Sequence, residues 1–308
     1  MNPGRIPLLE AAAACVLLTS CGNLAGPKPS GRLCVTATTG MIADAARHIA
    51  GELADVRELM GPGVDPHLYK ATQGDLRRLA GSDLILYNGL HLEGRMGDTF
   101  AEMAKRTRVV AVTETIPLRQ LRELQGVAGQ YDPHVWFDVS LWHIVTLRIR
   151  DALIEADPVH RDTYLERAAA YAQELDALRA FCLQRIAEIP PDQRVLITAH
   201  DAFGYFGRAY GMEILGVQGI STAAEYGLQD ITRLVGVIVK RRIKAVFVES
   251  SVSPRSINAL IEGARANGHE VRLGGQLYSD AMGAASTPDG TYIGMVRHNV
   301  DTIVEALK

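Results

Sequence analysis

The sequence predicts an α/β protein with two lobes, each with a parallel-rich β-sheet flanked by helices, joined by one long rigid helix. Short apolar runs alternate with helical patterns in both halves of the chain, which is typical of βα units around parallel sheets. A single long helical pattern separates these two regions. The chain has 308 residues, which suits two domains, because one domain usually has roughly 100–200 residues.

Residues 1–20 have the pattern of a secretory signal peptide. Arg5 is followed by a mostly apolar stretch, and small residues lead up to Cys21. The apolar stretch is shorter than the ~20 residues that a membrane span needs. Its ending, Leu-Thr-Ser-Cys, resembles a bacterial lipobox, which implies lipidation of Cys21 and an extracytoplasmic, membrane-anchored protein. The alternative is an ordinary helix packed on the body. Residues 21–31, with their Gly and Pro, are predicted to be a flexible tether.

The first lobe is predicted at residues 32–158. Four apolar runs predict strands, two helical patterns lie between them, and further helical patterning follows His134. The predicted strands are 32–38, 56–60, 83–87 and 109–112, and the predicted helices are 41–51 and 72–80.

The linking helix is predicted at residues 159–189. Apolar and small residues recur there at steps of three and four, which defines one buried face, and two prolines follow. The residues of this face are Tyr164, Ala168, Tyr171, Leu175, Leu178, Cys182, Ile186 and Ile189. The second lobe, residues 190–308, repeats the alternation of strands and helices. Its strands are predicted at 195–198, 212–217, 245–249 and 270–273, and its helices at 228–241, 254–266 and 291–307.

The composition excludes several classes of function. With 47% hydrophobic and 22% charged residues, the chain is in the usual globular range. A net charge of −3 gives no basis for binding nucleic acid or a polybasic attraction to membranes. Cys34 and Cys182 are expected to be buried free thiols rather than a disulfide.

Four side chains are candidate metal ligands. The tripeptide Asp-Pro-His occurs twice and ends at His67 and His134, while His200 and Asp280 follow predicted apolar segments of the second lobe. Imidazole nitrogens and carboxylate oxygens suit divalent first-row metals, and proline stiffens the backbone beside the first two histidines. Ligands of parallel sheets bind beyond the carboxyl ends of the strands, so these residues are expected to meet between the lobes.

Each candidate also has a simpler explanation, since a single histidine after a strand is usually a hydrogen-bonded loop residue. Four neighbouring carboxylates are candidates for orienting the imidazoles: Asp65, Asp132, Asp201 and Glu249. Glu249 is equally well explained as a residue at the entry to a helix. His91 either lies near the cleft or packs in the first lobe. The remaining histidines have helical or turn contexts that predict no site: His48, His143, His160, His269 and His298.

Five motifs in order resemble the TroA-type (cluster A-I) solute-binding proteins of metal ABC transporters. They are Gly61-Pro62-Gly63-Val64-Asp65-Pro66-His67-Leu68-Tyr69, Asn88-Gly89-Leu90-His91-Leu92-Glu93, Asp132-Pro133-His134-Val135-Trp136, Thr198-Ala199-His200-Asp201-Ala202-Phe203 and Tyr278-Ser279-Asp280. The resemblance covers the chain from about residue 32 to its end. It implies a monomer that binds a metal through His67, His134, His200 and Asp280. It further implies delivery of the metal to a permease driven by an ATPase.

The resemblance implies Zn²⁺ or Mn²⁺ as the transported ligand. The stretch 114–131 has no histidine, so the His-rich loop of zinc-specialised relatives is absent, and three His with one Asp resemble the TroA subgroup. Nitrogen-rich sites bind Zn²⁺ more tightly than Mn²⁺. The imidazoles must be neutral to bind, so affinity is expected to fall below a pH of about 6.5.

A continuous linking helix should resist hinge bending, so release is expected through small lobe or loop shifts that withdraw Asp280 with its Gly283-Ala284-Ala285 neighbourhood. Two other functions stay open at this point. A zinc hydrolase would need an open coordination position, which a fourth ligand closes, and no H-E-x-x-H pattern is present. A surface adhesin role could coexist with transport, although no aromatic patch or repeat supports it.

Overall fold

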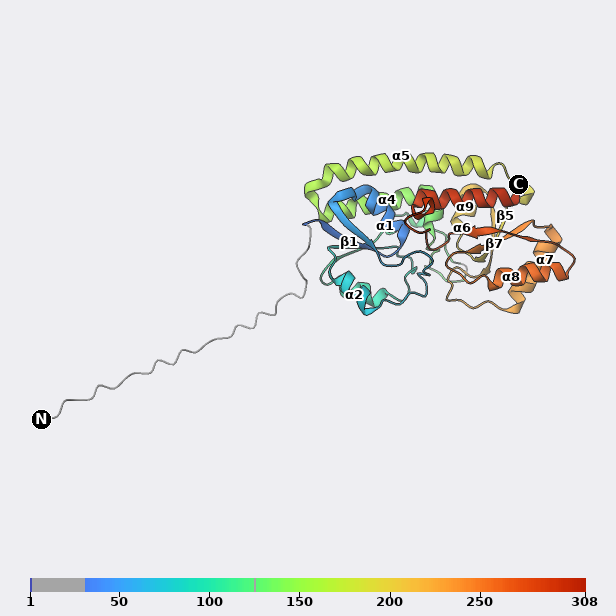
Figure 1. The fold of residues 1–308 in the computed structure, drawn as a ribbon, viewed down its shortest axis with the longest axis horizontal. Coiled ribbons are helices and arrows are strands. Elements are labelled where there is room, and N and C mark those ends of the chain that lie inside the picture. The colour runs from blue at the N-terminus through green and yellow to red at the C-terminus, as the bar shows by residue number, and fades with distance from the viewer. Residues whose placement is uncertain (2–30, 125) are drawn as a thin grey trace.

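The computed structural model describes residue 1 and residues 31–124 and 126–308. The predicted signal peptide, the cysteine of the lipobox and nearly all of the tether lie outside the described residues. The described body is elongated, and one long helix runs along its side across both halves (Figure 1). Within the described residues, no helix is both long and apolar enough to cross a bilayer.

The first half is built on a four-stranded parallel sheet in the order β2-β1-β3-β4. The strands are β1 Leu33–Ala37, β2 Ala54–Glu58, β3 Leu84–Tyr87 and β4 Arg108–Ala111, and the helices between them are α1 Gly40–Ala50, α2 Gln73–Ala80 and α3 Gly97–Met103. The predicted elements are confirmed within a few residues. Helix α3 was not predicted, because it has seven residues and buries only Phe100, which gives no periodic signal.

Two helices follow the site residue His134. Helix α4, Val139–Ala156, packs against α5, Arg161–Ile186, which is the predicted linking helix. The seven buried residues of α5 all belong to the face expected from the sequence. At a rise of 1.5 Å per residue, its 26 residues span roughly 39 Å, which is long enough to brace both halves.

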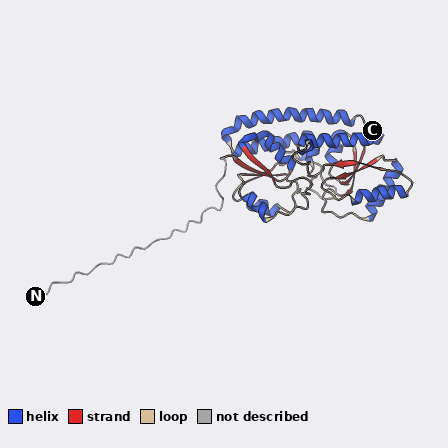
Figure 2. Ribbon diagram, viewed as in Figure 1, coloured by secondary structure: helices blue, strands red, loops and turns tan. Residues whose placement is uncertain are grey.

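The second half contains two parallel strand pairs, β5-β6 and β7-β8, with β5 next to β7 (Figure 2). The strands are β5 Val195–His200, β6 Glu213–Gln218, β7 Ala245–Glu249 and β8 Arg272–Leu277, and the helices are α6 Gly204–Tyr210, α7 Leu228–Arg241, α8 Arg255–Ala266 and α9 Tyr292–Leu307. Strand β8 lies further along the chain than expected. Gly274 and Gly275 interrupt its apolar pattern, and a Cβ at Gly274 would lie only 2.5 Å from the Phe247 ring.

The largest hydrophobic cluster among the described residues is shared by the two halves. It takes side chains from β1, α1, α4 and α5 as well as from β5, α6 and α9. Tyr292 at the start of α9 stacks on Trp142, with ring centroids 5.0 Å apart. The Tyr292 hydroxyl donates to the Trp136 carbonyl at 2.7 Å, and its backbone N–H donates to Asp44 at 3.0 Å. These buried contacts fix the second half against the first.

Both described cysteines are free thiols, as expected. Cys182 is buried in α5, whereas Cys34 is half-exposed, so the expectation of burial is wrong for Cys34. Strand β2 pairs with one edge of β1, but the first two residues of β1, Leu33 and Cys34, are only half-buried. Burial raises the pKa of the Cys182 thiol to about 12.

We expect Cys182 to resist alkylation in the native protein, because the thiolate is the reactive form and burial suppresses it. Iodoacetamide at pH 8, followed by peptide mass spectrometry, should label Cys34 and spare Cys182. Guanidinium chloride should make both reactive. Equal labelling of the two thiols in the native protein would contradict the packing of α5 described here.

Candidate metal centre

The four predicted ligands meet in one buried cluster between the halves. One donor atom from each of His67, His134, His200 and Asp280 lies within 4.8 Å of all the others. His67 is in the loop between β2 and α2, and His134 precedes a single 3₁₀ turn before α4. His200 is the last residue of β5, and Asp280 closely follows β8. The two halves therefore each supply two of the donors.

The distances among the donors are short. The Nε2 atoms of His67 and His134 are 3.3 Å apart. Asp280 Oδ1 lies 3.3 Å from His134 Nε2, and Asp280 Oδ2 lies 3.3 Å from His200 Nε2 and 3.9 Å from His67 Nε2. Both Asp280 oxygens are buried without a hydrogen-bond partner among the described residues. Two buried carboxylate oxygens that face imidazole nitrogens without a hydrogen bond are an arrangement that could hold a cation.

His134 is held by the aspartate of its own motif. Asp132 Oδ1 accepts from the His134 backbone N–H at 3.0 Å and lies 2.7 Å from Nδ1, which leaves Nε2 free to face the cluster. The Arg122 guanidinium pairs with the other Asp132 oxygen. The side-chain amide of Asn88 donates to the Pro133 carbonyl at 3.0 Å and fixes the same turn.

His200 is held by Glu249. Of the two explanations considered for Glu249, a carboxylate that orients an imidazole and a residue at the entry to a helix, the structure supports the first. Glu249 Oε1 accepts from the His200 backbone N–H at 2.8 Å, and Oε2 lies 2.5 Å from Nδ1. Both residues end neighbouring strands, so the carboxylate reaches the imidazole directly. The Asp201 backbone N–H instead donates to the carbonyls of Gln218 and Gly219. Burial raises the pKa of Asp201 to about 6.

His67 has a looser environment. Asp65 Oδ1 accepts from the His67 backbone N–H at 2.9 Å, which closes a short turn around the proline between them. Asp65 Oδ2 accepts from the Thr222 hydroxyl of the second half at 2.6 Å. Asp65 is half-buried, whereas the carboxylates that hold the other two imidazoles are fully buried.

The surroundings of the three imidazoles shift their pKa values in different directions. Burial, helped by the neighbouring His134 and His200, outweighs the opposing effect of Asp280 and lowers the pKa of His67 to about 4. Burial also opposes charge on His134, but Asp132 and Asp280 outweigh it and raise that pKa to about 9. Glu249 and Asp280 raise the pKa of His200, and the two imidazoles hold the pKa of Asp280 well below its usual value.

Two supports of the site were not foreseen from the sequence. The Trp136 indole N–H donates to the Ser279 carbonyl at 3.0 Å, which ties the segment after His134 to the residue before Asp280. The Arg122 backbone N–H donates to the Tyr205 hydroxyl at 3.0 Å, and that hydroxyl donates to the Asp132 carbonyl at 2.9 Å. These contacts join residues far apart in sequence, so no local pattern reveals them.

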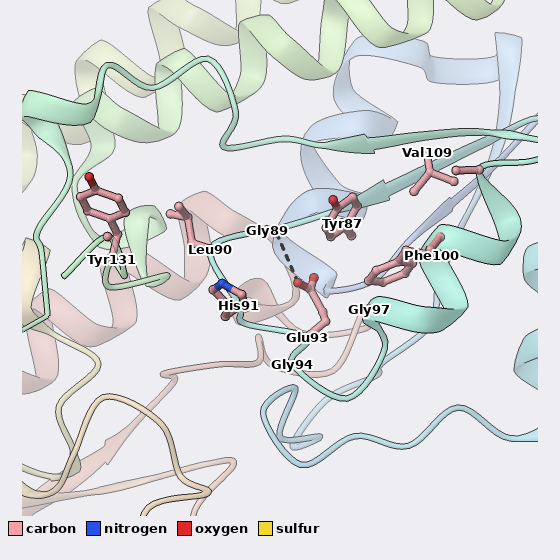
Figure 3. Close-up of a pocket in the computed structure, with 13 residues that line it drawn as sticks. Tyr87, Gly89, Leu90, His91, Glu93, Gly94, Gly97, Phe100, Val109 and Tyr131 are labelled. Carbon is pink, nitrogen blue, oxygen red and sulfur yellow. Dashed lines mark hydrogen bonds between the residues drawn. The ribbon is translucent and has the colours of Figure 1, made fainter. Parts of the chain in front are cut away.

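His91 is not part of this cluster. It is exposed and lines a separate pocket of about 580 Å³ between the 88–97 loop, α3 and Tyr131 (Figure 3). Glu93 in this loop accepts from the backbone N–H groups of Asn88 and Gly89 and from the Thr38 hydroxyl. The Asn88-to-Glu93 motif therefore supports the loop beside the site and contributes no metal ligand.

A buried cluster of three imidazoles and one carboxylate between two α/β halves defines a metal-binding solute-binding protein. The chain belongs to the ZnuA family, whose model, described as "Zinc-uptake complex component A periplasmic", matches residues 35–306. The protein is therefore an extracytoplasmic binding component of a metal uptake system and not an enzyme. The resemblance inferred from the sequence is confirmed.

Curated relatives match nearly the whole chain. It is 50% identical over 292 residues to "Manganese-binding lipoprotein MntA" of Bacillus subtilis, which covers 94% of this chain and 95% of that one. It is 47% identical over 305 residues to "Zinc-binding protein TroA" of Treponema pallidum, which covers 97% and 98%. The solved structure of the periplasmic zinc-binding protein TroA from Treponema pallidum matches with a TM-score of 0.88 at 49% identity, over 90% of this chain and 99% of that chain.

We expect Glu249→Gln to weaken metal binding about 10- to 100-fold, because the amide no longer orients and polarises His200 as a carboxylate does. Isothermal titration of the metal-free protein with Zn²⁺ measures the change. Glu262→Gln, on the exposed face of α8, is the matched control and should bind as wild type does. Unchanged affinity in Glu249→Gln would contradict the role assigned to this carboxylate.

Proposed function

We propose that His67, His134, His200 and Asp280 bind one divalent metal ion as the transported ligand. The observation that carries the proposal is the buried cluster of four donors from four separate chain segments. Metal–ligand distances of about 2.0–2.1 Å place neighbouring tetrahedral ligands about 3.3 Å apart. Three of the donor separations are 3.3 Å, which fits an ion at the centre of the cluster.

We propose Zn²⁺ or Mn²⁺ as that ion. Three nitrogens favour Zn²⁺, which binds such sites more tightly than Mn²⁺ does. Both Asp280 oxygens face the imidazoles, so the carboxylate can also bind in bidentate fashion and supply the extra coordination that suits Mn²⁺. Relatives named for manganese and for zinc have nearly the same identity to this chain, which is consistent with binding of both ions.

We further propose the setting in which the ion is delivered. The protein acts as a monomer that passes the ion to a membrane permease driven by a cytoplasmic ATPase, and lipidated Cys21 anchors it. The lobe bounds are residues 32–158 and 190–308, with residues 159–189 as the link and residues 21–31 as the tether. The family model described for an uptake complex and the relatives named as lipoproteins support this setting.

Loss of one ligand should weaken binding severely. We expect His134→Ala and Asp280→Ala each to lower Zn²⁺ affinity more than about 100-fold, because a direct ligand contributes more than a residue that only orients one. Isothermal titration with Zn²⁺ and with Mn²⁺ measures this. His91→Asn is the control, since His91 lies outside the cluster. Wild-type affinity in both ligand variants would refute the proposed site.

Metal binding should release protons at neutral pH. The pKa of His134 is raised to about 9 in the metal-free protein, so this imidazole carries a proton that the ion must displace. Affinity should therefore rise from pH 6 to pH 9, a higher range than an unperturbed imidazole predicts. Titration in buffers of different ionisation enthalpy counts the protons released. Binding without proton release at pH 7 would contradict the electrostatics described above.

A further inference from the structure

The two sides of the metal site differ in how the halves are joined. On one side, Trp136 and Ser279 are both buried, and their hydrogen bond lies two residues from His134 and one from Asp280. A second hydrogen bond lies on the same side, donated by the Tyr292 hydroxyl to the Trp136 carbonyl. All of these groups are buried, so water does not compete for the hydrogen bonds on this side.

The segment that follows Asp280 is also closely packed. A Cβ at Gly290 would lie 2.3 Å from the Ala284 carbonyl oxygen, and one at Gly283 would lie 3.0 Å from the Asp289 carbonyl carbon. The Gly283 backbone N–H donates to the Asp289 carbonyl at 2.9 Å. This packing keeps the segment 283–290 compact beside Asp280.

The other side is joined through half-exposed polar groups. Asp65 uses one carboxylate oxygen for the His67 backbone N–H and the other for the Thr222 hydroxyl, at 2.9 and 2.6 Å. Thr222 is in the loop between β6 and α7, so this bond crosses from one half to the other. Asp65 and Thr222 are both partly accessible to water, which can compete for their hydrogen bonds.

The Thr222 loop is itself fixed to a metal ligand. The Gln218 side chain donates to the Thr222 carbonyl at 2.7 Å and also to the Ala224 carbonyl. Gln218 ends β6 and pairs in the parallel ladder with His200 at the end of β5. A continuous series of contacts therefore runs from His200 through Gln218, Thr222 and Asp65 to His67, independent of any bound ion.

We propose that the hydrogen bond from Thr222 to Asp65 is a latch that holds His67 in place and sets the rate of metal release. Thr222 is thus a positioning residue that acts through Asp65 and touches no metal. The site opens on this side, because the opposite side is bound into the shared core. This inference rests on the proposed function, since it concerns release of the ion from the same four ligands.

The test compares three substitutions of threonine in the full protein. Thr222→Val keeps the shape and removes the hydroxyl, Thr222→Ser keeps the hydroxyl, and Thr232→Val makes the same exchange on α7. The Thr232 hydroxyl donates to the Leu228 carbonyl of its own helix. Each protein is loaded with Zn²⁺ and mixed with excess chelator in a stopped-flow instrument, and the release rate is measured.

We expect Thr222→Val to release Zn²⁺ at least about tenfold faster, because a hydrogen bond to a charged group typically contributes that much. Thr222→Ser and Thr232→Val should stay within about twofold of wild type. The melting temperature of the metal-free Thr222→Val protein should change little, which separates the latch from a general role in stability.

Wild-type release from Thr222→Val would overturn the latch, and so would equally fast release from Thr222→Ser. Neither result would affect the ligand assignment, because the wild-type protein would still bind Zn²⁺. A wild-type protein that binds no Zn²⁺, or that binds it equally well after His134→Ala, would instead overturn the proposed function and the latch with it.

Discussion

The structure depends on holding three imidazoles and one carboxylate together in a buried place. Desolvation alone would drive such groups apart or neutralise them, since a buried charge is costly without a partner. Here Asp132 and Glu249 face the far nitrogens of His134 and His200, and Asp280 faces the near ones. Opposite charges therefore alternate through the cluster. The site keeps its geometry because each charged group is paired, and the four donors remain arranged around one point.

The fold supplies the stiffness that this arrangement needs. Helices α4, α5 and α9 contribute to the hydrophobic cluster that spans both halves. Trp136 in the turn after His134 bonds Ser279, which precedes Asp280, and Tyr292 at the start of α9. Two of the imidazoles thus belong to rigid strand ends or core-facing turns. His67 differs, because it is in a loop and its support crosses the halves through half-exposed groups. His134 and His200 therefore have more rigid supports than His67 does.

The sequence predicted much of this organisation, and the reasons for its failures are physical. The period and the length of the apolar patterns were sufficient to predict β1, α5 and α7, because long or regular apolar patterns indicate burial directly. The Asp-Pro-His motifs and the strand ends identified all four donors. Short α3, the position of β8 and the contacts of Arg122 and Trp136 were missed. Helix α3 is too short to give a periodic signal, and the other features depend on packing between distant segments, such as Gly274 against Phe247, which no local pattern records.

A binding protein for an uptake system must retain its ion in solution and give it up at the membrane. Four preorganised ligands favour retention, because little ordering is required when the ion binds. If all four ligands were held equally rigidly, the high affinity alone would make release of the ion slow. The cross-lobe hydrogen bond from Thr222 to Asp65 at the water-accessible edge changes this relation, since breaking it weakens the support of His67 without disturbing the core that holds the other donors. Contact with a partner surface near residues 61–67 or the Thr222 loop can then act on this bond, and affinity in solution and release at the membrane can be set by different residues.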